Sequence, residues 1–83
     1  MALPDDLRSL LDRTLNLDGR PADFDRDTAL MGALPELDSM GVVAVITAFE
    51  DIFGFAVDDD EIDGSVFQTF GSLLDFVSAK LGG

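Results

Sequence analysis

The sequence contains no cysteine and no histidine, and these two absences remove whole classes of chemistry. Without cysteine the chain can form no disulfide and offers no thiolate to a metal ion. Without histidine it lacks the usual general base of enzymes and the most common transition-metal ligand. Because a serine nucleophile needs a base beside it, we expect a protein that is not an enzyme and that acts with separate enzymes.

Basic residues are also scarce: five Lys and Arg stand against 17 Asp and Glu, which gives a formal net charge of -12. Such a surface repels the phosphates of nucleic acids and of anionic membranes, so neither is an expected partner. It attracts proteins with basic docking surfaces instead. An acidic, non-enzymatic interaction domain without a prosthetic group would carry the same charge and stays an alternative.

Long apolar runs are missing as well, since the longest one, 42–49, is interrupted by Thr47 and is too short to cross a bilayer. The first six residues show neither the basic stretch nor the apolar core of a signal peptide. We therefore expect a cytoplasmic protein. Its 83 residues predict one domain, 1–83, which we expect to be monomeric.

The apolar residues that are present recur at helical spacing in three stretches. A first helix is predicted on the face formed by Leu3, Leu7, Leu10, Leu11 and Leu15. A second, from about Ser39 to Phe53, has a stripe of Val42, Val45, Ile46, Phe49, Ile52 and Phe53. A third is capped by Thr69 and has a face of Phe70, Leu73, Leu74, Val77 and Leu81.

The segment between the first two helices has no single period, and loops of this length in compact domains are usually functional or held by apolar anchors. The candidate anchors are Phe24, Leu30, Met31, Leu34 and Leu37. A fourth, short helix is predicted from Asp58, as N-cap, to Asp63, with Glu61 completing a capping box. The expected fold is all-α: a small four-helix bundle of three main helices and one short helix, with a long first loop.

The acidic stretch after the second helix has part of an EF-hand pattern, with Asp59, Glu61, Asp63 and Gly64 at positions one, three, five and six. Position twelve should be a glutamate that binds calcium through both oxygens, and it is Phe70. We therefore predict no metal site.

Ser39 lies in the segment Leu-Asp-Ser-Met-Gly, 37–41, where the long loop meets the second helix. A helix start offers unpaired backbone N–H groups and a positive dipole end, so it is a favourable place for a phosphodiester. An Asp-Ser pair at a helix start is also a common cap, so position alone decides nothing.

Asp38-Ser39-Met40 resembles the Asp-Ser-Leu signature of acyl carrier proteins. Three more segments are similar to that family in the right order: 49–54 to the end of its second helix, 57–61 to the acidic turn that follows, and 67–73 to the start of its last helix. The tripeptide alone is a weak signal. The ordered set, which spans nearly the whole chain, is a strong one.

The resemblance implies that Ser39 carries a covalent 4'-phosphopantetheine arm, attached by a phosphopantetheinyl transferase that uses coenzyme A and magnesium. It implies that Asp38 helps that transferase hold its metal and substrate. The arm's thiol would hold acyl groups as thioesters and present them to acyl-loading and acyl-processing enzymes, as in fatty acid or polyketide biosynthesis. It also implies that partners bind the second helix, with Glu50 and Asp51 as its charged end.

Helix geometry predicts which residues face those partners. If the apolar stripe faces the core, the other faces of the second helix carry Met40, Val43, Ala44, Thr47 and Asp51. Exposed apolar side chains beside an attachment point are typical of a protein contact surface.

Two departures from the family pattern argue against a role in fatty-acid synthesis. Gly41 and Ala44 stand where the family often carries acids, and 34–37 differs from the Gly-Ala pair common before the signature. The segment 38–41 is closer to D-alanyl carrier proteins, so a D-alanyl or aminoacyl carrier is an alternative. Both departures favour a carrier for a dedicated biosynthetic pathway.

Overall fold

A computed structural model describes residues 3–58 and 61–82 of the chain. Three α-helices dominate it: α1 (Leu3–Leu15), α2 (Ser39–Ala48) and α3 (Phe70–Lys80). Two shorter helical turns were not predicted as such: a 3-10 turn in the first loop, η1 (Arg20–Asp23), and a π-helical turn that extends α2, η2 (Phe49–Phe53). The predicted all-α fold, with three main helices and a long first loop, is confirmed.

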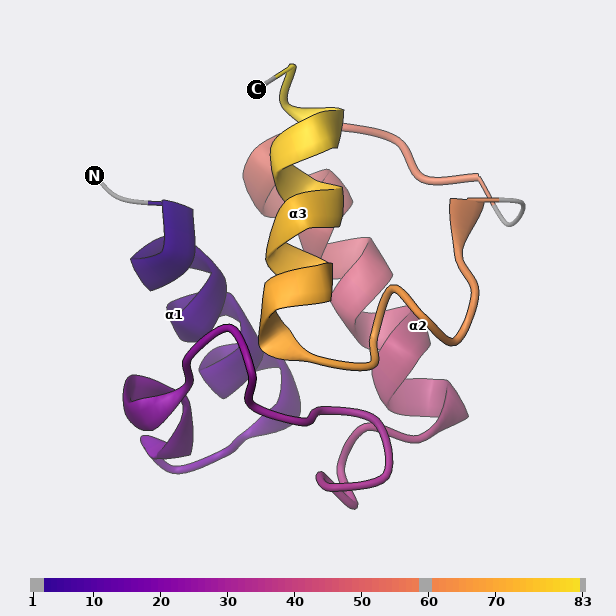
Figure 1. Ribbon diagram of the computed structural model, residues 1–83. Coiled ribbons are helices and arrows are strands. Elements are labelled where there is room, and N and C mark those ends of the chain that lie inside the picture. The colour runs from indigo at the N-terminus through magenta and orange to yellow at the C-terminus, as the bar shows by residue number, and fades with distance from the viewer. Residues whose placement is uncertain (1–2, 59–60, 83) are drawn as a thin grey trace.

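The helices surround one hydrophobic core, and the long first loop passes across one end of it (Figure 1). From the helices and η2, the core receives the buried side chains of Leu7, Leu10, Leu11, Leu15, Val45, Phe49, Phe70, Leu73 and Val77. Val42, Ile46 and Phe53 pack against this core but are only partly buried. The helical periods of the sequence therefore identify most of what the helices bury.

The long first loop forms a wall of the core. Four of the five predicted anchors are buried, namely Phe24, Leu30, Leu34 and Leu37. Its backbone joins the start of α3 through four hydrogen bonds of 2.9–3.0 Å: Leu30 N–H to Gln68 O, Met31 N–H to Phe67 O, Phe70 N–H to Thr28 O and Gly71 N–H to Arg26 O. Arg8 of α1 adds to this junction, because its guanidinium donates to the carbonyl of Phe24 and lies over the Phe70 ring.

Three predictions of buried residues are wrong. Met31 is exposed because it lies in the turn that the Leu30 carbonyl closes by accepting from the N–H groups of Ala33 and Leu34. Ile52 is exposed because the wider π-helical turn rotates it away from the face that Phe49 buries. Leu81 is exposed because it is the C-cap of α3, one turn beyond Val77, the last buried residue of that helix.

Two buried residues have no helical period that could predict them. Leu17 and Phe67, both almost fully inaccessible, lie in the connections rather than in helices. The predicted short helix at 58–63 includes residues 59 and 60, which lie outside the described residues. On either side of them, the Glu61 N–H donates to the Asp58 carbonyl at 2.9 Å.

Lys80, the only lysine in the sequence, links the connection between η2 and α3 to the end of α3. The Lys80 ammonium lies 2.7 and 3.0 Å from the two carboxylate oxygens of Glu61 and 5.9 Å from the centre of the Phe55 ring. Glu61 also accepts from the backbone N–H of Asp58 at 2.9 Å. The Asp58 N–H, and after it Lys80, lower the pKa of Glu61 from its ordinary value of 4.5.

A carboxylate whose pKa is lower in the folded state stabilises the fold above its unfolded-state pKa and loses that effect as pH falls through the folded value. We therefore expect Glu61→Gln to lower the melting temperature at pH 7, and the difference from wild type to shrink below pH 4.5. Thermal unfolding from pH 7 to pH 3 checks this.

Asp75→Asn is the matched control, because the Asp75–Arg26 ion pair is well exposed on both sides and should contribute little. A Glu61→Gln difference that is absent at pH 7, or that stays constant down to pH 3, would contradict the prediction.

Candidate functional site

Ser39 is the first residue of α2 and lies where the long loop ends. Asp38, not Ser39, is the N-cap: its Oδ1 accepts from the Gly41 N–H at 2.9 Å. Both Asp38 and Ser39 are exposed. Because Asp38 caps the helix, the Ser39 hydroxyl is not needed for the cap and is accessible to an approaching molecule.

Buried side chains and a close backbone contact support the turn that leads into α2. Leu34 and Leu37 are buried, and the Leu37 N–H donates to the Leu34 carbonyl at 3.0 Å. The carbonyl of Glu36 lies directly against Gly41, since a Cβ at that position would be 2.3 Å from the carbonyl oxygen and 3.2 Å from a methyl group of Leu15. Only glycine permits this approach between the loop and the first turn of the helix.

Glu36 and Gly41 were not predicted to shape the site, because their contact joins a loop carbonyl to a helix and leaves no local pattern. The Glu36 carboxylate forms an ion pair with Arg20, which begins η1. The proximity of its own backbone N–H, followed by the Arg20 guanidinium, lowers the pKa of Glu36. The carboxylate is therefore ionised at neutral pH.

The exposed side of α2 carries the residues predicted to face partners. Met40 is 76% exposed and Val43 is 58% exposed, and Thr47 is also exposed. These positions are three and four residues apart, so they lie on one side of the helix. We call Met40, Val43 and Thr47 the outer face of α2.

Charge is absent from this helix and begins just after it. No residue of Ser39–Ala48 is charged, whereas Glu50 and Asp51 in the following π-helical turn are both exposed. Ala44 is half-buried and so contributes less to the surface than predicted. Exposed Ile52, which was expected in the core, adds an apolar side chain beside the acidic pair.

Metal ligands do not gather in the part of the chain that the structure describes, where no three acidic side chains are arranged to hold an ion. Asp59 and Asp60 of the EF-hand-like stretch lie outside it. Among the described helices, none is long and apolar enough to span a bilayer.

We expect Gly41→Ala to destabilise the protein by about 1–3 kcal/mol, the usual range for forcing an extra methyl into a packed contact. Helix propensity alone predicts the opposite sign, since alanine is favoured over glycine inside a helix by roughly 0.5–1 kcal/mol. Urea unfolding measures the difference.

Gly64→Ala is the control, because a Cβ there meets nothing within 4 Å. If Gly41→Ala is as stable as Gly64→Ala, the Glu36 carbonyl does not constrain the turn.

Comparison with known proteins shows which family the chain belongs to. No protein-family model matches the chain. Among solved structures it is similar to a holo acyl carrier protein from Nitrosomonas europaea, determined by NMR in solution, with 47% sequence identity over 100% of both chains and a TM-score of 0.89. Identity at this level along the full length of both chains exceeds what a shared fold alone requires, and the chain belongs to the acyl carrier protein family.

Proposed function

We propose that this protein carries acyl groups on a 4'-phosphopantetheine arm bound to Ser39 through a phosphodiester. The observation that supports it most directly is the exposure of Ser39 at the first turn of α2, with Asp38 capping the helix beside it. The similar Nitrosomonas protein is a holo carrier, which agrees with a covalently loaded form of this chain.

Ser39 is also the best placed of the five serines in the sequence. The Ser72 hydroxyl donates to the carbonyls of Val66 and Thr69 and belongs to the capping box of α3. The Ser65 hydroxyl donates to Asp63. Ser9 and Ser78 lie inside helices rather than at a helix start, where N–H groups and the dipole favour a phosphate.

Transfer of the arm forms a bond between Ser39 Oγ and the phosphorus that bears pantetheine in coenzyme A. The bond from that phosphorus to adenosine 3',5'-bisphosphate breaks. The hydroxyl proton passes to a base of the transferase, since the chain offers no histidine for this role. One oxygen of Asp38 is engaged in the cap, so any role of Asp38 with the transferase's magnesium falls to its second oxygen.

The thioester chemistry would depend on the arm, because the chain itself has no thiol. Acyl-loading and acyl-processing enzymes would bind the loaded chain and react with the thioester. A monomer in the cytoplasm, serving a dedicated biosynthetic pathway, fits this role. The absence of charge along α2 supports a pathway-specific set of partners.

Measurement of thiols tests the attachment site. Wild type should contain no thiol before treatment with coenzyme A, magnesium and a broad-specificity transferase, and one thiol per chain afterwards. Ser39→Ala should contain none in either state. It should remain folded, because Asp38 provides the cap and a lost cap costs only about 1 kcal/mol in any case. A Ser39→Ala protein that gains a thiol would refute the assignment.

The partner surface that we propose is the outer face of α2, continued by Ala44 and by Glu50 and Asp51. An apolar centre with a charged edge is the usual composition of a protein contact. The acidic pair would attract basic groups of a partner and speed association, while the apolar side chains would supply contact area.

We expect Val43→Asp to lower kcat/KM for arm transfer by about tenfold, as for a contact worth ~1.4 kcal/mol, with little change in melting temperature. Leu81→Asp is the matched control, since Leu81 is a similarly exposed apolar residue at the far end of α3. Equal transfer rates for the two variants would show that Val43 is not part of the contact with the transferase.

A further inference from the structure

Arg20 connects two parts of the first loop that are 16 residues apart. Its Nε donates to the carbonyl of Leu17 at 3.0 Å, and its terminal nitrogen pairs with Oε2 of Glu36. The arginine is therefore fixed at one end to the corner that follows α1. At the other end it holds the turn that precedes α2.

Glu36 is well placed to transmit this restraint. It lies two residues before the cap Asp38, beside buried Leu37, and its carbonyl is packed against Gly41. Its second carboxylate oxygen, Oε1, is buried and accepts no hydrogen bond within the described residues. Without Arg20 the half-buried carboxylate would lose its charged partner, and the turn at 36–38 would lose its link through Arg20 to the corner after α1.

We propose that the Arg20–Glu36 ion pair positions Ser39 for attachment of the phosphopantetheine arm, by holding the turn at 36–38 against Gly41. The proposal rests on the function proposed above for Ser39. Arg20 and Glu36 act through the cap and the helix start, so they are positioning residues and touch neither the arm nor coenzyme A.

A positioning role has a kinetic consequence that differs from a loss of stability. If the turn moves, Ser39 is correctly presented for only part of the time, and the apparent affinity for the transferase falls by that fraction. Once the complex has formed, the chemical step is unchanged. The ion pair is partly exposed, with Arg20 at 48% and Glu36 at 35%, so its loss should change global stability little.

The test compares Arg20→Ala, Glu36→Gln and the double variant with wild type. Intact mass gives the initial rate of arm transfer at a series of carrier concentrations, using a broad-specificity transferase and coenzyme A. We expect each single variant to raise KM roughly three- to tenfold with kcat within about twofold, by the population argument above. The double variant should be no worse than either single variant, because both remove the same link.

Amide hydrogen exchange on the unmodified proteins supplies a readout that does not involve the transferase. The Gly41 and Val42 N–H groups donate to the side chain and backbone of Asp38, respectively. Both should exchange faster in Arg20→Ala and Glu36→Gln than in wild type.

Arg26→Ala is the matched control. Arg26 also pairs with an acid, Asp75, and its backbone carbonyl also lies against a glycine in the first turn of a helix, Gly71 of α3. The variant removes the same charge from the same loop, yet leaves the Ser39 turn untouched. It should match wild type in KM and in exchange at Gly41.

An unchanged KM in Arg20→Ala would overturn the proposal, and so would an equal rise in Arg26→Ala, which indicates a general effect of charge. A raised KM with unchanged exchange at Gly41 would also overturn it, because Arg20 would then contact the transferase directly. If wild type gains no arm, the function proposed for Ser39 fails, and the exchange rates alone decide whether the pair holds the turn.

Discussion

Burial of the long first loop is the constraint on which the rest of the structure depends. Three short helices in a chain of 83 residues enclose only a thin core, and Phe24, Leu30 and Leu37 complete it from the loop. The same loop is hydrogen-bonded to the start of α3 and packed against the start of α2. The packing of the loop that completes the core therefore also positions Ser39, which lies on the exposed side of a turn whose other side is buried.

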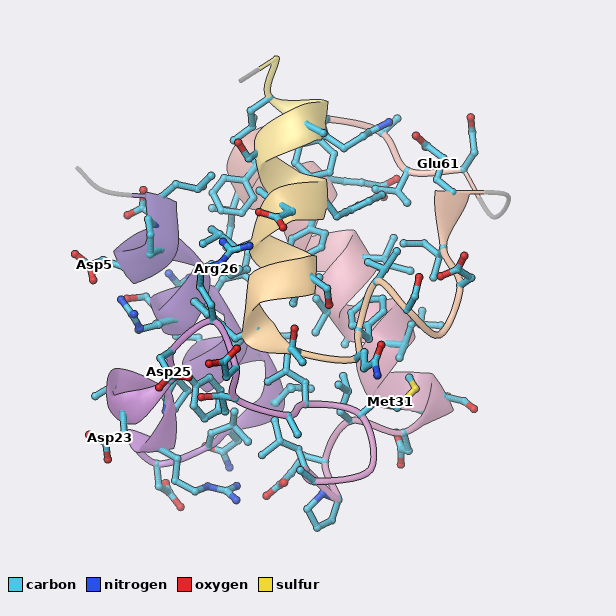
Figure 2. All side chains as sticks on the ribbon, in the orientation of Figure 1. Asp5, Asp23, Asp25, Arg26, Met31 and Glu61 are labelled. Atoms are coloured by element: carbon cyan, nitrogen blue, oxygen red, sulfur yellow. The ribbon has the colours of Figure 1, made fainter. Side chains whose placement is uncertain are left out.

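The two helix starts are built in the same way. In each, a loop carbonyl approaches a glycine so closely that a Cβ could not fit: Glu36 against Gly41, and Arg26 against Gly71. A side chain caps each helix, Asp38 for α2 and Thr69 for α3. These contacts differ in what they leave exposed, because only the α2 start presents a serine hydroxyl to solvent. Arg26, in the loop, lies beside α3, where it pairs with Asp75 (Figure 2).

How much could be predicted from the sequence depended on whether a residue obeys a local period. The leucines of α1 repeat regularly, so their burial was predictable, and the family resemblance pointed to Ser39 before any geometry was known. Ile52 was mispredicted because a π-helical turn changes the period within one helix. The roles of Phe67 and Gly41 depend on loop contacts between distant segments, which no periodicity in the sequence encodes.

The most direct test of the central claim is to locate the arm on the chain. Wild type is treated with coenzyme A, magnesium and a broad-specificity transferase, and the intact protein is then fragmented in a mass spectrometer. The account predicts that every fragment containing Ser39 carries the added mass of one phosphopantetheine and that no fragment lacking Ser39 does. Added mass on a fragment that contains only Ser9, Ser65, Ser72 or Ser78, or none on any fragment, would contradict it.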